Sequence, residues 1–153
     1  MEVKKIGVVG CGIMGSGIAQ VCAQSGYLVV VSEISDELLM KGLKSIDSVL
    51  SRSVNKGKLS SQEKESILSR ITGTTDVNRF SECDLVIEAA PEVLEIKKDI
   101  FKQLDQVCPE HAILASNTSV LSVTDLAAVT KRPDKVVGMH FANPVPVMRS
   151  LEM

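Results

Sequence analysis

The chain has 153 residues, of which 44% are hydrophobic, 24% are charged and 3% are aromatic. A chain of this length can bury one sizeable core, and its composition is that of an ordinary folded protein rather than a disordered one. The formal net charge of -2 at pH 7 offers no basic surface to a nucleic acid or an anionic membrane, so we expect neither as a partner.

The first predicted unit is a strand, a tight turn, a helix and a second strand. Residues 4–9 are apolar and β-branched, which favours a buried strand. Apolar residues at helical spacing predict a helix over residues 13–24, which the Ser-Gly pair at 25–26 ends. A second buried strand is predicted over residues 27–31. Together they form a βαβ unit.

The rest of the chain continues this alternation after a helical hairpin. Amphipathic patterns predict the hairpin helices over residues 36–54 and 61–71, and Ser60-x-x-Glu63 is a capping-box signature for the second. Further strands are predicted over residues 71–75, 84–88, 112–116 and 135–140, and further helices over residues 92–107 and 122–130. We expect one α/β domain over residues 1–153, a Rossmann-type doubly wound, mainly parallel sheet with a helical-hairpin insertion.

The four cysteines lie far apart, and none forms a C-x-x-C pair or a zinc-type array with histidine. This pattern indicates free thiols in a reducing compartment and no metal site. The first apolar segment spans about five residues, too few for a signal peptide core or a membrane span. We therefore expect a cytoplasmic protein.

The turn after the first strand reads Gly10-x-Gly12-x-x-Gly15, the fingerprint of dinucleotide binding. Side chains at the first two positions would obstruct the turn and an approaching pyrophosphate, and the third glycine lets helix and strand pack closely. A tight turn without a ligand could carry the same glycines. The predicted strand before the motif and the predicted helix after it favour the dinucleotide, whose phosphates would face the free N–H groups of the helix.

Glu33 stands at the end of the second predicted strand, about 20 residues after the motif. Its carboxylate can accept hydrogen bonds from both hydroxyls of the adenosine ribose, and its charge would repel a 2′-phosphate. We therefore expect NAD rather than NADP as cofactor. The alternative is a solvated carboxylate at a strand end.

The chain has two histidines, of which one lies where a nicotinamide could bind. His111 follows Pro109-Glu in a polar turn and is expected at the surface. His140 closes a predicted strand, at the sheet edge where doubly wound folds bind ligands. From position alone, His140 could also be a structural histidine.

Four separated motifs carry a family resemblance: G-C-G-I-M-G-S-G-I-A-Q from residue 10, D-L-V-I-E-A from 84, S-N-T-S from 116 and M-H-F-A-N-P-V-P-V-M from 139. Together they resemble the NAD-binding domain of the L-3-hydroxyacyl-CoA dehydrogenases, especially the bacterial 3-hydroxybutyryl-CoA dehydrogenases. The resemblance implies hydride transfer between NAD and C3 of a short-chain (S)-3-hydroxyacyl-CoA such as 3-hydroxybutyryl-CoA, in fatty-acid or butyrate metabolism. The family's C-terminal helical domain is absent from this sequence, so we expect NAD binding with little activity, and homodimerisation only with that domain.

The resemblance also implies roles for single residues. His140 would be the general base, Glu152 would orient its imidazole, and Ser119 would hydrogen-bond the 3-oxygen of the substrate. It implies cofactor contacts from Gly10, Gly12, Ile13, Met14, Gly15, Glu33, Glu92, Lys97, Asn117 and Asn143. It implies substrate contacts from Ser119 and Asn143, and from Lys56 and Lys58 near the CoA phosphates.

Plainer readings of these residues remain open. Glu92 and Lys97 could be surface charges of a helix, Asn117 and Ser119 could form a turn, and Lys56 and Lys58 could be solvated. Two other functions also remain: a different Rossmann dehydrogenase, which would need a catalytic Lys or Cys beyond this region, and a nonenzymatic NAD-binding module. The joint presence of Ser119, His140 and Glu152 argues against a loss of chemistry.

Overall fold

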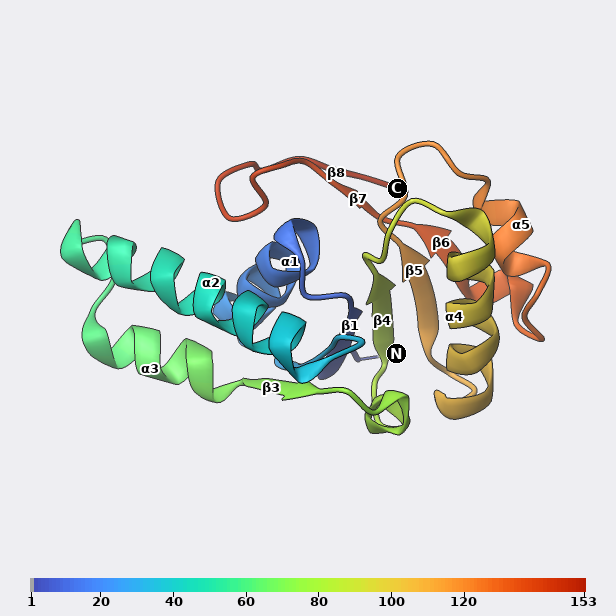
Figure 1. Ribbon diagram of the computed structural model, residues 1–153, viewed down its shortest axis with the longest axis horizontal. Coiled ribbons are helices and arrows are strands. Elements are labelled where there is room, and N and C mark those ends of the chain that lie inside the picture. Colours follow the sequence, from blue (N-terminus) through green and yellow to red (C-terminus); the bar gives the residue numbers. More distant parts are fainter. Residues whose placement is uncertain (1) are drawn as a thin grey trace.

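The computed structural model describes residues 2–153, in which six parallel strands form a sheet in the order β3-β2-β1-β4-β5-β6 (Figure 1). The sheet strands are β1 (Lys5–Val9), β2 (Leu28–Ser32), β3 (Ile71–Thr74), β4 (Leu85–Glu88), β5 (Ile113–Ser116) and β6 (Val136–Gly138). The order runs outward from β1 in one direction and then crosses to β4, which confirms the predicted doubly wound fold. The carboxyl ends of β1 and β4 therefore flank the switch point where such folds bind ligands.

Helices cover both faces of the sheet (Figure 1). The helices are α1 (Ile13–Gln24), α2 (Asp36–Asn55), α3 (Ser61–Ser69), α4 (Leu94–Val107) and α5 (Val123–Ala127), with short 3-10 turns η1 (Val77–Phe80) and η2 (Pro133–Lys135). The predicted hairpin is formed by α2 and α3, which extend beyond the sheet. Within residues 2–153, each helix is too short or too polar to cross a membrane.

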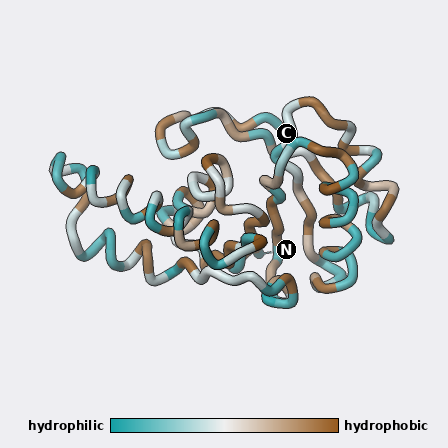
Figure 2. Tube along the Cα trace, in the orientation of Figure 1, coloured by the Kyte–Doolittle hydropathy of each residue, from teal (hydrophilic) through white to brown (hydrophobic). Residues whose placement is uncertain are grey.

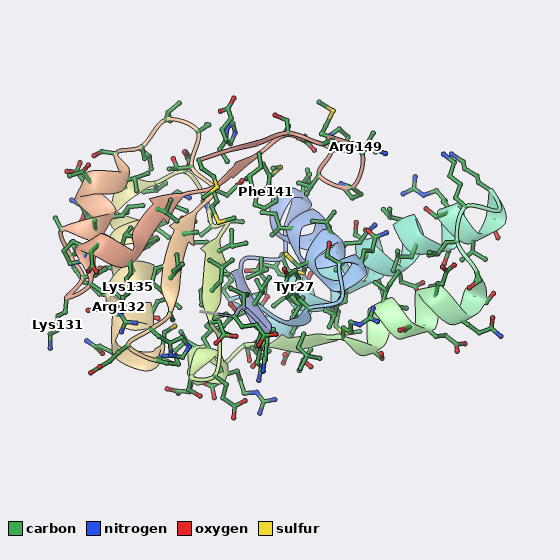
Figure 3. The ribbon with its side chains drawn as sticks, turned by 180° about the vertical axis from the view of Figure 1, so that it is seen from behind. Tyr27, Lys131, Arg132, Lys135, Phe141 and Arg149 are labelled. Atoms are coloured by element: carbon green, nitrogen blue, oxygen red, sulfur yellow. The ribbon has the colours of Figure 1, made fainter. Side chains whose placement is uncertain are left out.

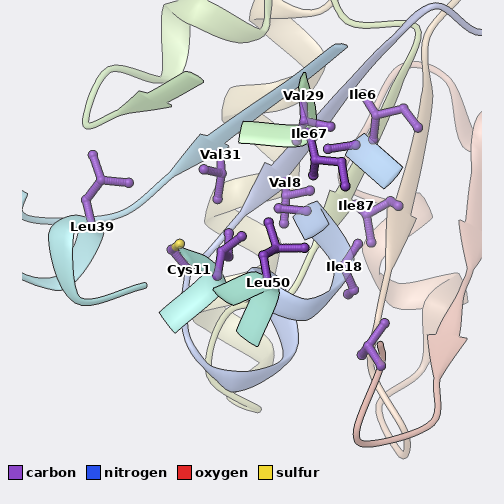
Figure 4. Close-up of a cluster of buried hydrophobic side chains, with 14 of the residues drawn as sticks. Ile6, Val8, Cys11, Ile18, Val29, Val31, Leu39, Leu50, Ile67 and Ile87 are labelled. Atoms are coloured by element: carbon purple, nitrogen blue, oxygen red, sulfur yellow. The ribbon is translucent and has the colours of Figure 1, made fainter. Parts of the chain in front are cut away.

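The sheet separates two hydrophobic clusters because successive side chains of a strand point to opposite faces. In β2, Val29 and Val31 pack in one cluster and Val30 in the other. The first cluster lies against the hairpin side and includes Ile18, Ile46, Leu50 and Ile67 (Figure 4). The second includes Phe80, Phe101, Leu104 and Leu126. Figure 2 shows the same pattern, with hydrophobic residues along the strands and mixed colours along the outer helices.

The capping box predicted at the start of α3 is confirmed. The Ser60 hydroxyl accepts a hydrogen bond from the N–H of Glu63 at 3.0 Å, and the Glu63 carboxylate accepts one from the N–H of Ser60 at 2.7 Å. These bonds hold the pKa of Glu63 below its usual value. Two otherwise unpaired backbone donors are satisfied, which explains why a nine-residue helix starts at this point.

Among the predicted boundaries that are wrong, two affect the candidate site, and the helix predicted over residues 122–130 ends earlier, at Ala127. The helix predicted from Glu92 begins at Leu94, because a turn closed by the N–H of Val93 and the carbonyl of Pro91 at 2.7 Å precedes it. The strand predicted over residues 135–140 ends at Gly138. The chain then leaves the sheet, and β7 (His140–Phe141) pairs antiparallel with β8 (Leu151–Glu152).

Asp84 ties the start of β1 to the start of β5. Its carboxylate accepts hydrogen bonds from the N–H groups of Lys4 at 2.8 Å and Lys5 at 3.0 Å, and contacts Nε2 of the exposed His111 at 2.9 Å. The Lys4 N–H first, and then His111 and the Lys5 N–H, hold the pKa of Asp84 below its usual value.

This lowered pKa predicts an acid-dependent loss of stability. A carboxylate with a depressed folded-state pKa stabilises the fold fully above the unfolded pKa of about 4, and the stabilisation is lost as the pH falls through the folded value. We expect Asp84→Asn to lower the free energy of unfolding at pH 7. Below about pH 4, the difference in this free energy between the variant and the original chain should become smaller. Urea unfolding at several pH values measures this, and a gap independent of pH would contradict it.

Candidate functional site

The glycine turn places the amino end of α1 at the switch point of the sheet. A Cβ added to Gly15 would lie 1.8 Å from the carbonyl oxygen of Gly10, so this glycine is needed for packing. A Cβ added to Gly12 meets nothing within 4 Å, so the space in front of Gly12 is open. Gly12 is the N-cap of α1, and no side chain caps the helix. These free N–H groups beside open space fit a diphosphate.

Glu33 lies beside this opening. Its Oε2 accepts a hydrogen bond from the N–H of Cys11 at 3.0 Å and its Oε1 accepts one from the N–H of Ile34 at 2.8 Å, so both oxygens are anchored to the backbone. Each oxygen keeps a further lone pair for a ribose hydroxyl. Glu33 lines a cavity of about 210 Å³ whose other walls are Cys11, Gly12, Ile13, Ser16, Leu38, Lys41, Gly42 and Ser45.

A second cavity, of about 380 Å³, lies at the carboxyl ends of β4 and β5. Seven of the residues that sequence reasoning selected line it: Met14, Glu92, Lys97, Asn117, Ser119, His140 and Asn143. They come from positions as distant as 14 and 143, and the fold brings them together. The remaining lining residues are Ala89, Ala90, Phe141 and Ala142.

His140 and Glu152 face each other across the β7–β8 pair. The strand register sets them directly opposite, and His140 Nδ1 lies 3.1 Å from Glu152 Oε2. If Nδ1–H donates to the carboxylate, Nε2 is an acceptor that can take a proton from a ligand. The carboxylate then stabilises the imidazolium that results. The arrangement is that of a general base with an orienting partner.

Asn117 positions the strand that carries His140. Its Oδ1 accepts a hydrogen bond from the N–H of Phe141 at 2.9 Å, which ties the loop after β5 to β7. Phe141 packs against the cluster that contains Ile18 of α1 (Figure 3). The side-chain NH₂ of Asn117 remains available to a ligand in the cavity. Asn117 is thus more than a turn former.

Charged side chains are buried at the back of this cavity. Lys97 is 1% exposed and Glu88 is 0% exposed, so Lys97 is not a solvated surface charge. Lys97 Nζ lies 2.6 Å from Glu88 Oε1, 3.1 Å from Glu92 Oε2 and 3.1 Å from the carbonyl oxygen of Ala90. Sequence reasoning missed Glu88; the signal was an acidic residue closing an otherwise apolar strand.

Glu92 bridges these charges to the loop that carries Ser119. Its Oε1 accepts hydrogen bonds from the Thr118 hydroxyl and from the N–H of Ser119, the latter at 3.2 Å. Burial opposes ionisation of Glu92, but the bond from Thr118 and the ammonium of Lys97 outweigh it and hold its pKa below the usual value. Glu92 therefore faces the cavity as a carboxylate.

A third cavity, of about 590 Å³, lies between α1, α2 and the loop of residues 143–147. Lys56 and Lys58 line it, as does Arg52, which sequence reasoning missed. Arg52 stands one helical turn before Lys56, so i, i+4 spacing could have found it. Three cations around one cavity fit a phosphorylated ligand.

The cysteines form no reactive centre. All four are free thiols, and burial raises the pKa of Cys83 to about 12 and that of Cys11, Cys22 and Cys108 to about 11. Such thiols are inert at neutral pH. Among residues 2–153, no three His, Cys, Asp or Glu side chains are grouped so that they could hold a metal ion.

Residues 5–153 match the sequence profile of the 3-hydroxyacyl-CoA dehydrogenase NAD-binding domain. A probable 3-hydroxybutyryl-CoA dehydrogenase of Bacillus subtilis is 46% identical over 100% of this chain and 53% of its own length. A 3-hydroxyadipyl-CoA dehydrogenase of Escherichia coli is 43% identical over 100% of this chain and 32% of its own. A crystal structure of (S)-3-hydroxybutyryl-CoA dehydrogenase from Ralstonia eutropha superposes with a TM-score of 0.96 at 47% identity, over 98% of this chain and 53% of that one. The chain thus spans about half the length of most of these relatives.

Proposed function

Because the chain belongs to the 3-hydroxyacyl-CoA dehydrogenase family and contains its NAD-binding domain, we propose that the protein transfers a hydride between NAD and C3 of a short-chain (S)-3-hydroxyacyl-CoA. The observation that carries this proposal is that His140, which pairs with Glu152, lines one cavity together with Ser119. The names of relatives in Bacillus subtilis and Ralstonia eutropha support 3-hydroxybutyryl-CoA and acetoacetyl-CoA as the substrate pair.

In the proposed mechanism, His140 removes the proton of the substrate hydroxyl. When bound, NAD supplies the acceptor for the hydride that leaves C3. Nε2 of His140 takes the hydroxyl proton, and Glu152 stabilises the positive charge that the imidazole gains. Ser119 holds the 3-oxygen by a hydrogen bond. In the reverse direction, His140 returns the proton to that oxygen.

We propose that the cavity beside Glu33 and the second cavity, at the carboxyl ends of β4 and β5, hold the two halves of the cofactor. Gly12 and the amino end of α1 face the diphosphate, and Glu33 accepts hydrogen bonds from the adenosine ribose. The other proposed contacts are Gly10, Ile13, Met14, Gly15, Glu92, Asn117 and Asn143, while Lys97 belongs to the same site and lies behind Glu92. Asn143 lies beside both the second and the third cavity, where it can also meet the substrate.

We propose that the third cavity receives the CoA part of the substrate. Arg52, Lys56 and Lys58 would pair with its phosphates, and Lys56 is an exposed residue at the C-cap of α2. The cavity reaches Asn143, so a chain anchored at these cations can extend toward His140.

We further propose that residues 1–153 are the NAD-binding unit of a cytoplasmic enzyme. The relatives carry further chain beyond the matched region. We infer that this further chain is needed for efficient turnover, since positioning of a transition state requires all walls of its site. It would also carry the homodimer contacts.

A cofactor titration and a turnover assay test the proposal. We expect the 153-residue chain to quench or shift NADH fluorescence in a saturable manner, and the native full-length protein to oxidise NADH with acetoacetyl-CoA. A full-length protein that binds NADH without turnover would be a nonenzymatic module. One that ignores the CoA thioester and acts on a sugar acid would be a different Rossmann dehydrogenase.

A further inference from the structure

We infer that Glu88 is a positioning residue that holds Lys97 in the core, so that Glu92 and the Ser119 loop keep the geometry of the cofactor cavity. The inference rests on the NAD-binding part of the proposed function. It assigns Lys97 an indirect role, acting through Glu92 rather than by direct contact with the cofactor.

The hydrogen bonds of Lys97 support the indirect role. An ammonium group has three N–H donors. Lys97 Nζ contacts Glu88 Oε1 at 2.6 Å, Glu92 Oε2 at 3.1 Å and the carbonyl oxygen of Ala90 at 3.1 Å, so all three donors have protein partners. A direct bond to a ligand would have to break one of these contacts.

The balance of charges explains why Lys97 has a second carboxylate, Glu88, beside it in addition to Glu92. Lys97 brings one positive charge, and Glu88 and Glu92 bring two negative ones. Glu88 is fully buried and cannot reach a ligand, so its charge serves to offset that of Lys97. The side chain of Glu92 is 38% exposed and keeps its negative charge for the cavity. Without the charge of Glu88, Glu92 would be the only carboxylate that pairs with the Lys97 ammonium.

Both carboxylate oxygens of Glu88 accept hydrogen bonds. Its Oε1 accepts the N–H of Ala90 at 2.6 Å as well as Lys97, and its Oε2 accepts the Ser116 hydroxyl at 2.6 Å. The Ser116 hydroxyl in turn accepts the N–H of Thr118 at 3.3 Å. The carboxylate therefore links the end of β4 to the end of β5, the two strands whose loops line the cavity.

The same network reaches the substrate side through Glu92. Its Oε1 bonds Thr118 and the N–H of Ser119, and its Oε2 faces Lys97. We therefore expect a shift of Lys97 toward or away from Glu92 to move the loop of Ser119. The buried pair sets the cofactor side and the substrate side of the cavity together.

The test compares a single with a paired substitution. Glu88→Gln has nearly the shape of glutamate and keeps an acceptor for Lys97, but it removes the charge. We expect this variant to bind NADH about tenfold more weakly, the effect of losing one modest contact. Glu88→Gln leaves the charge of Lys97 without its buried partner, so we also expect it to lower the melting temperature. Glu88→Gln with Lys97→Met removes both buried charges. We expect this paired variant to recover much of the lost melting temperature while its NADH binding stays weak. NADH fluorescence and thermal unfolding measure both quantities.

The exposed pair on the same helix provides the matched control. Glu95 and Lys98 lie 3.3 Å apart, outside the cavity, and Glu95→Gln with Lys98→Met should leave NADH affinity unchanged. If the paired variant at 88 and 97 binds NADH as tightly as the original chain, the buried pair is merely structural and the inference is wrong. Failure of the proposed reaction alone would look different: the original chain would bind NADH, but the full-length protein would not reduce acetoacetyl-CoA.

Discussion

Replacement of His140 by glutamine is expected to lower kcat for acetoacetyl-CoA reduction by the full-length protein about 10²–10⁴-fold, the range for loss of a general acid or base. Glutamine can still form a hydrogen bond to Glu152, but it cannot carry a proton. His140 Nδ1 lies 3.1 Å from Glu152 Oε2, so the substitution leaves room for the same contact. Steady-state kinetics at saturating NADH measures the change.

NADH affinity is the control for this prediction. His140 lies on β7 and lines the second cavity but not the cavity beside Gly12 and Glu33, so His140→Gln should change NADH affinity far less than it changes kcat. Glu152→Gln should reduce kcat less than His140→Gln, because it removes stabilisation of the imidazolium and leaves the base in place. A His140→Gln protein with nearly full kcat would exclude His140 as the proton acceptor.

Substitution of Gly12 by alanine is expected to weaken NADH binding about tenfold to a hundredfold without unfolding the chain. A Cβ at this position meets no protein atom within 4 Å, and it projects into the opening in front of α1. Displacing a diphosphate there removes one or more hydrogen bonds to a charged group, each worth about 1.5–3 kcal/mol. Fluorescence titration gives the affinity, and thermal unfolding shows whether the fold is kept.

Substitution of Gly15 in the same motif should mainly reduce the stability of the fold, whereas substitution of Gly12 should mainly reduce NADH affinity. An added Cβ would lie 1.8 Å from the Gly10 carbonyl oxygen, so Gly15→Ala must move α1 away from β1. We expect it to lower the free energy of unfolding by about 3 kcal/mol, the upper end for overpacking. If Gly12→Ala instead unfolded the chain and kept NADH affinity per folded molecule, the open space at Gly12 would not be a cofactor site.

Most of the fold could be predicted because its signals are local. The periodicity of apolar residues identified α1 at its observed bounds and located every strand of the main sheet within about two residues. The capping box at Ser60 identified the start of α3. These patterns act over a few neighbouring residues, so no knowledge of the tertiary structure was needed to read them.

The motifs identified most of the candidate site for a related reason. In a parallel sheet, strand ends meet at one edge, so residues just after strands must gather there. This places Ser119, Asn117 and Glu92 together, although their positions span residues 92–119. The residue pattern also raised NAD as the cofactor, through the glycine turn and Glu33.

Only the tertiary structure showed how these residues contact one another. The sequence by itself determined the order of the elements, the glycine turn and the presence of a histidine near the carboxyl end of the last predicted strand. It could not show that β8 sets Glu152 opposite His140, because two-residue strands carry no periodic signal. Nor could it show that Glu88 and Lys97 are buried as a pair, since a charged residue is buried only where the fold supplies an opposite charge.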